Sequence, residues 1–214
     1  MSIESIGADY TAIALIVDRS GSMHSCAEDT KGGVKQFIAG QKQNPGKASF
    51  TLVQFDHQYE VLNNFSDLNQ IDEDEFVKQY KPRGSTALLD AMGQTIHEMQ
   101  KNIDKMEESA KPNRVVVAIV TDGQENSSMN FTIDKIKSLI EEKQSAGWNF
   151  IFLSADLNSF NAAESYGLKS SGVVYFDSSN VDKAFQSIDE KVTTARSGGE
   201  VAFTDEERSK LAGS

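Results

Sequence analysis

Polar side chains in three separate loops could together hold one divalent cation. Asp18, Ser20 and Ser22 form an Asp-x-Ser-x-Ser pattern that directly follows the apolar run 10–17. Gly21 lets the backbone bend sharply, so that both serine hydroxyls can turn toward one point. Carboxylate and hydroxyl oxygens are hard ligands, which suit Mg²⁺ or Mn²⁺ better than zinc or copper. By itself the pattern is also typical of a turn, because Asp and Ser commonly follow a strand.

Two further loops supply the remaining oxygen ligands. A second apolar run, 115–120, ends in Thr121-Asp122-Gly123 and so repeats the order of strand, Asp and Gly. The loop 83–86 ends in Thr86, where a helical pattern begins, so its hydroxyl can cap the helix and also point at the cation. Ligands of open α/β sheets gather beyond the carboxyl ends of the strands. We therefore predict one metal site, with the ligands Asp18, Ser20, Ser22, Thr86 and Asp122.

The spacing of apolar residues predicts alternating strands and helices. Strands are expected at 10–17, 49–55, 59–65, 115–120, 148–155 and 173–176. Helices are expected at 27–42, 86–109, 132–146, 160–166 and 181–195. Only residues 56–58 separate the second and third strands, which demands an antiparallel pair. The expected fold is α/β: a doubly wound, Rossmann-like open sheet, mostly parallel with one antiparallel edge strand, helices on both faces and the order 3-2-1-4-5-6. This order makes the first and fourth strands neighbours, with Asp18 and Asp122 at their ends.

The set Asp18-x-Ser20-x-Ser22, Gly84-Ser85-Thr86 and Thr121-Asp122-Gly123 resembles the metal-ion-dependent adhesion site (MIDAS) of von Willebrand factor type A (VWA) domains. The resemblance covers roughly residues 8–197, and every ligand position of the motif is filled. It implies a divalent cation, usually Mg²⁺, held by the hydroxyls directly and by the aspartates directly or through water. Mn²⁺ is an alternative and Ca²⁺ is compatible with the same ligand types. The resemblance also implies that an Asp or Glu of a partner protein completes the shell, and that the domain is not an enzyme.

The same patterns predict the domain organisation. We expect an N-terminal tail at 1–8, a VWA-like domain at 9–197 and a C-terminal tail at 198–214 that contains a short helix. Gly198-Gly199 breaks the last long helix, and Thr204 begins a capping-box pattern. The C-terminal tail is expected to be mobile or to pack on a partner. In the VWA family a change of metal ligation can be linked to movement of the last helix, here 181–195.

The expected function is protein binding through the metal, and the alternative is a Mg²⁺-dependent phosphotransfer enzyme of the haloacid dehalogenase type. That enzyme class also places an Asp after its first strand, but it needs a second carboxylate two residues on, where Ser20 stands here. Serine hydrolysis is disfavoured, because neither Ser20 nor Ser22 lies in a Gly-x-Ser-x-Gly elbow. Arg19, inside the metal loop, could contact an acidic partner or be a plain exposed turn residue. A subunit that presents its metal face to a larger assembly is compatible with the protein-binding reading.

Composition excludes several other classes of function. The chain has 32 acidic and 21 basic residues and a net charge of −11, which argues against binding to nucleic acid or to an anionic membrane surface. Its longest apolar run falls far short of the roughly 20 residues that span a bilayer. Cys26 is the only cysteine, so an intramolecular disulfide is impossible, and the stretch 1–9 lacks the basic residues of a signal peptide. The expected location is the cytoplasm.

Overall fold

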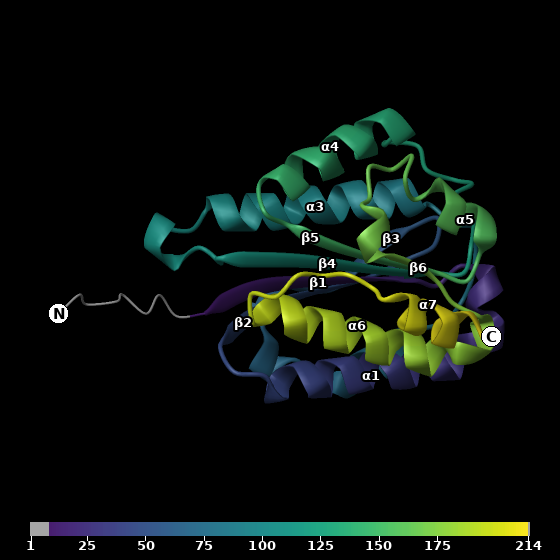
Figure 1. Cartoon of the computed structure of the whole chain (residues 1–214), viewed down its shortest axis with the longest axis horizontal. Helices are drawn as coiled ribbons and strands as arrows, with labels where there is room; N and C mark the ends of the chain where they lie inside the picture. Colours follow the sequence, from purple (N-terminus) through teal and green to yellow (C-terminus); the bar gives the residue numbers. More distant parts are fainter. Residues whose placement is uncertain (1–8, 214) are drawn as a thin grey trace.

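The computed structural model describes residues 9–213, so the expected tail at 1–8 lies outside the described residues. The described chain forms a six-stranded sheet in the order β3-β2-β1-β4-β5-β6, with helices on both faces (Figure 1). The strands are β1 (Tyr10–Asp18), β2 (Lys47–Phe55), β3 (Tyr59–Asp67), β4 (Arg114–Thr121), β5 (Asn149–Ser154) and β6 (Val173–Tyr175). The α-helices are α1 (Ala27–Gln43), α2 (Glu73–Gln79), α3 (Leu88–Asp104), α4 (Ile133–Ser145), α5 (Leu157–Ala162), α6 (Val181–Arg196) and α7 (Asp205–Ala212). Only β2 and β3 pair antiparallel, and the predicted fold class and strand order are confirmed.

The two central strands place the candidate site at their carboxyl ends. Every residue of β1 is buried, as a strand covered on both faces must be. β1 and β4 are parallel neighbours, with Val17 opposite Val120. The loops that begin with Asp18 and Asp122 therefore leave the sheet side by side, at the carboxyl end where such folds bind their ligands.

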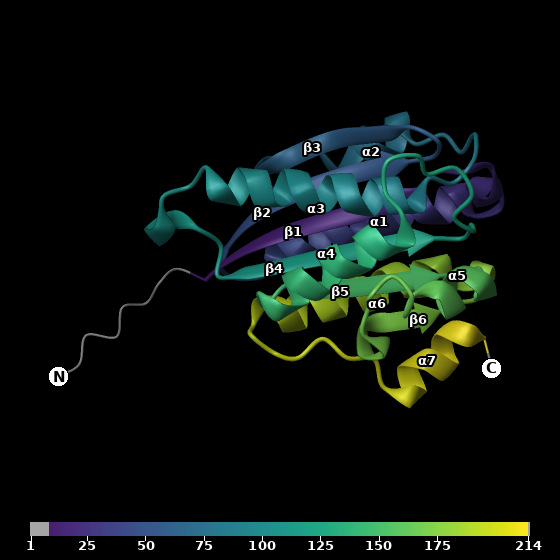
Figure 2. The ribbon, with the colours of Figure 1, turned by 90° about the horizontal axis from the view of Figure 1, so that it is seen from above.

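Two helical layers enclose the sheet, and Figures 1 and 2 show α1 and α6 on one face and α3 and α4 on the other. The methionine-containing stripe of α3 faces the core, since Met92 and Met99 are fully buried. Gly33 explains how closely α1 approaches α6, because a Cβ at this position would lie 2.3 Å from the ring of Phe185. Gly33 therefore serves the packing of α1 against α6, whereas a methyl group at Gly32 would meet nothing within 4 Å.

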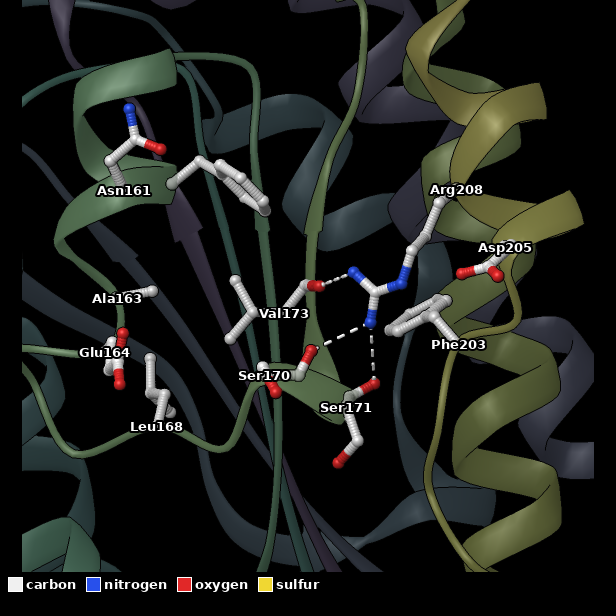
Figure 3. Close-up of a pocket in the computed structure, with 11 residues that line it drawn as sticks. Asn161, Ala163, Glu164, Leu168, Ser170, Ser171, Val173, Phe203, Asp205 and Arg208 are labelled. Atoms are coloured by element: carbon white, nitrogen blue, oxygen red, sulfur yellow. Dashed lines mark hydrogen bonds between the residues drawn. The ribbon is translucent and has the colours of Figure 1, made fainter.

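The C-terminal segment packs on the domain's own core instead of forming the mobile or partner-bound tail that we expected. Val201, Phe203 and Leu211 are buried in the same hydrophobic cluster as the inner faces of α1 and α6. The predicted capping box is present at Thr204. The guanidinium of Arg208 donates hydrogen bonds to the carbonyl oxygens of residues 170, 171 and 173 (Figure 3). This segment therefore covers the outer edge of β6, which would otherwise expose unpaired backbone groups.

A cavity of about 500 Å³ opens between α5, β6 and the C-terminal segment (Figure 3). Phe160, Leu168 and Phe203 form its apolar wall, and none of the candidate metal ligands lines it. Within residues 9–213 no helix is long and apolar enough to cross a bilayer.

Candidate metal centre

Asp18 anchors the centre at the end of β1, where its side chain is fully buried. Its Oδ1 atom accepts the backbone N–H of Ser20 at 2.6 Å, and its Oδ2 atom accepts the hydroxyl of Thr121 at 2.6 Å. Burial raises the pKa of Asp18 to about 7, against the lowering effect of these two hydrogen bonds. A carboxylate that burial destabilises in this way is one that a neighbouring cation would stabilise strongly.

Hydroxyl contacts connect the first loop to the loop that follows β4. The Ser20 and Ser22 hydroxyl oxygens lie 3.0 Å apart, and the Ser22 hydroxyl donates to Asp122 Oδ1 at 2.6 Å. Burial also raises the pKa of Asp122, opposed by the hydrogen bond from Ser22. Ser20 is buried whereas Ser22 is exposed, so the cluster runs from the interior to the surface.

Thr86 reaches the same point from the loop that precedes α3. A Cβ at Gly123 would lie 2.7 Å from Thr86 Oγ1, 3.3 Å from Ser20 Oγ and 3.4 Å from Asp18 Oδ2. Oxygens from two of the three loops therefore face Gly123 in the third loop, on the side where it has no side chain. The absent methyl group leaves a cradle lined by oxygen.

This donor set fits a hard divalent cation. Two carboxylates and three hydroxyls, all oxygen donors, are the ligand types that Mg²⁺, Mn²⁺ and Ca²⁺ prefer. Within the described part of the chain, no three His, Cys, Asp or Glu side chains gather as a metal-binding group, so the centre depends on its hydroxyls. The structure brings together all five candidate ligands, and their binding of a metal stays a prediction.

Thr86 is not the helix cap that we expected. α3 begins at Leu88 with Ala87 in the N-cap position, and no side chain there makes a capping hydrogen bond. Instead, the loop after β4 closes this helix end: the Thr86 N–H donates to Asn126 Oδ1 at 2.9 Å, and the Asn126 N–H donates to the Thr86 carbonyl oxygen at 3.0 Å. Glu125 Oε2 accepts the N–H of Leu89 at 2.8 Å. The Thr86 hydroxyl is thereby left to the oxygen cluster.

Both expectations for Arg19 are wrong. The residue is only 3% exposed, so it is neither a rim contact for a partner nor an exposed turn residue. Its guanidinium forms ion pairs with Asp56 Oδ2 at 3.0 Å and Glu60 Oε2 at 2.6 Å. The sequence pattern contained no signal for this pairing, because Asp56 reads as an ordinary residue of the turn after β2.

Comparison with known proteins identifies the family of this fold. The family model of the von Willebrand factor type A domain matches residues 12–201. The chain belongs to the VWA family. A search of curated proteins finds no match.

Solved VWA-like structures show the same fold at low sequence identity. The vWF domain of the pilus tip protein Mfa5 from Porphyromonas gingivalis is 10% identical, with a TM-score of 0.66 over 91% of this chain and 99% of that one. A von Willebrand factor type A protein from Catenulispora acidiphila is 13% identical, with a TM-score of 0.60 over 86% of this chain and 43% of that one. Proximal thread matrix protein 1 from the mussel byssus is 15% identical, with a TM-score of 0.60 over 87% of this chain and 46% of that one. This VWA domain thus spans less than half the length of the last two proteins. Nothing in these comparisons supports the haloacid dehalogenase alternative.

Proposed function

We propose that this VWA domain is a divalent-cation-dependent protein-binding module. Asp18, Ser20, Ser22, Thr86 and Asp122 would hold Mg²⁺ or Mn²⁺, and an Asp or Glu of a partner protein would complete the shell. The observation that carries the proposal is the convergence of Thr86, Ser20 and Asp18 oxygens around the missing side chain of Gly123. VWA domains are generally adhesion or interaction modules, not enzymes.

Charge supports a bridging role for the cation. The chain has a net charge of −11, so an acidic partner would be repelled by the protein alone. A divalent cation offsets the charge of the two carboxylates, Asp18 and Asp122, at one point of this surface. Since three of the five donors are neutral hydroxyls, a bound ion keeps a net attraction for a further carboxylate. Exposed Ser22 and half-buried Asp122 mark the side from which a partner would approach.

The setting of this interaction is also a proposal. The Mfa5 domain comes from a pilus tip protein, and the mussel protein is a thread matrix protein of the byssus. We propose that the present domain presents its metal face to a larger assembly. We also propose a cytoplasmic location for the domain, which suits its buried and free cysteine, Cys26.

Calorimetric titration of Mg²⁺ into chelator-treated protein tests the metal site. Ser22→Ala removes a ligand that is exposed, so the fold should tolerate it, and Ser25→Ala in the same loop is the matched control. We expect one ion per chain for the wild type and for Ser25→Ala, and an affinity at least about tenfold lower for Ser22→Ala. Equal affinities in all three proteins, or no binding to the wild type at millimolar Mg²⁺, would contradict the proposal.

Acetate provides a probe for the carboxylate. With Mn²⁺ bound, the relaxation rate of water protons reports water on the ion, and added acetate should lower that rate by displacing it. The Ser22→Ala variant should show a weaker response at equal total Mn²⁺. A relaxation rate that stays constant up to high acetate concentrations would contradict the partner-carboxylate part of the proposal.

A further inference from the structure

We infer that Asp56 is a positioning residue for the candidate metal centre. From the turn between β2 and β3 it fastens two of the three ligand-bearing loops to each other, although it touches no ligand side chain itself. The inference rests on the proposed function, because it concerns the same metal site. It adds a fourth loop to a centre that the motif describes with three.

The carboxylate of Asp56 joins the two loops through two arginines. Its Oδ2 atom accepts the Nε–H of Arg19 at 3.0 Å and the Nε–H of Arg83 at 2.8 Å. Arg19 lies between two ligands, Asp18 and Ser20, and Arg83 begins the loop that ends in Thr86. A single buried oxygen therefore connects the first loop to the second.

Backbone hydrogen bonds reinforce this connection. The Asp56 carbonyl oxygen accepts the N–H of Ala87, the residue next to Thr86, at 2.9 Å. The Arg83 N–H donates to the Arg19 carbonyl oxygen at 2.7 Å, and the Arg19 N–H donates to the Phe55 carbonyl oxygen at 2.7 Å. The turn itself is held by the N–H of Gln58, which donates to Asp56 Oδ1 at 2.6 Å.

The charge of Asp56 is what keeps the two arginines together. The Arg19 side chain is 4% exposed, and a buried guanidinium requires a nearby counter-charge. Glu60, which also contacts both arginines, is 41% exposed, so solvent weakens its attraction, whereas Asp56 is completely buried. Without the Asp56 charge the two guanidiniums would repel each other across a neutral group. Ser20 and Thr86, which are attached to the same loops, would then move apart.

A small movement is enough to affect the metal. Mg²⁺ demands nearly ideal octahedral geometry at about 2.0–2.1 Å, so ligands on two loops must keep their separation closely. Partners that orient metal ligands without touching the ion typically change metal affinity by about 10- to 100-fold when they are mutated. We expect an effect of this size from Asp56.

The test is Asp56→Asn, which keeps the shape of the side chain and removes its charge. Its matched control is Asp189→Asn, on α6, whose carboxylate accepts Gln41 Nε2 at 2.9 Å near the C-terminal end of α1 and touches no metal loop. Mg²⁺ affinity is measured by calorimetry at a temperature where the melting curves of the metal-free proteins show every variant folded. Asp56→Asn can be compared with the wild type only if it folds, so Arg83→Met serves as a second variant. The Arg83 side chain is 49% exposed, so its loss should leave the fold intact.

Asp56→Asn should bind Mg²⁺ about 10- to 100-fold more weakly than the wild type, and Arg83→Met should also bind more weakly, while Asp189→Asn binds normally. If the wild type binds Mg²⁺ and both Asp56→Asn and Arg83→Met bind it with the same affinity, the inference is overturned and the proposed function stands. Equal weakening in Asp189→Asn would also overturn it, because the effect would then follow from general destabilisation. An absence of binding to the wild type would remove the proposed function and this inference with it.

Discussion

The cradle beside Gly123 provides a prediction that separates metal binding from folding. Gly123→Ala adds a methyl group 2.7 Å from Thr86 Oγ1, where ordinary contacts lie at 3.4–4 Å. Gly123 does not have a left-handed backbone conformation, so alanine introduces no backbone strain. Restoring an ordinary contact requires a shift of about 0.7 Å. Such overpacking costs about 1–3 kcal/mol of stability, a loss that a folded domain can tolerate.

The same shift has a much larger effect on the metal. A displacement of about 0.7 Å takes the Thr86 hydroxyl out of the range of about 2.0–2.1 Å that Mg²⁺ ligands require. The methyl group also lies 3.3 Å from Ser20 Oγ and 3.4 Å from Asp18 Oδ2, so it occupies the space that these oxygens share. We expect Mg²⁺ affinity to fall by at least about tenfold.

The assay is calorimetric titration of Mg²⁺, with Gly32→Ala as the control. Gly32 lies in α1, and a methyl group added there would have nothing within 4 Å, so alanine should leave metal binding unchanged and stabilise the helix by up to about 1 kcal/mol. If Gly123→Ala is folded and binds Mg²⁺ as tightly as Gly32→Ala does, the cradle is not where the metal binds, and the reasoning from its geometry is refuted.

Two predictions concern the stability of the scaffold. Asp90→Asn should cost about 2–3 kcal/mol at pH 7, because the Asp90 carboxylate accepts the N–H groups of residues 129–131. Burial raises the pKa of Asp90, but these hydrogen bonds outweigh burial and hold the pKa below its usual value. The stability advantage of Asp90 over Asn is therefore complete above the ordinary Asp pKa and is lost as pH falls through the lowered pKa of the folded state. Urea denaturation at pH 7 and pH 3 should show the stability difference between wild type and Asp90→Asn shrink in acid, and a difference that widens in acid would contradict this sign. Arg196→Met should destabilise the domain by about 2–4 kcal/mol without changing Mg²⁺ affinity, because the buried guanidinium donates to the carbonyl oxygens of residues 41, 44, 45 and 46, far from the metal loops. A urea midpoint equal to that of the wild type would show that water replaces the guanidinium at little cost.

The sheet was predictable because its signals are local. The buried runs of β1 and β4 each end in a polar loop, and the connection of three residues between β2 and β3 permits only an antiparallel pair. Strand order then followed from the rules of chain connection. The five candidate ligands come from similarly local patterns, since each lies within a few residues of the end of a strand or the start of a helix.

The supporting contacts could not be predicted, because they join residues that are distant in the sequence. Arg19 meets Asp56 across 37 positions, and the N–H of Thr86 meets Asn126 across 40. No sequence periodicity relates such distant positions. Arg19, in a glycine-containing turn, is therefore predicted from the sequence to be exposed. The C-terminal segment shows the same effect, because Arg208 bonds to carbonyl oxygens that lie 35–38 positions earlier.

The most direct test of the metal centre is a crystal structure of the protein grown with Mn²⁺, with anomalous scattering measured to locate the ion. We predict one anomalous peak in the cradle beside Gly123, bonded to hydroxyl oxygens of Ser20, Ser22 and Thr86. A Mn²⁺ peak elsewhere on the protein, with the cradle filled by water alone, would contradict this assignment.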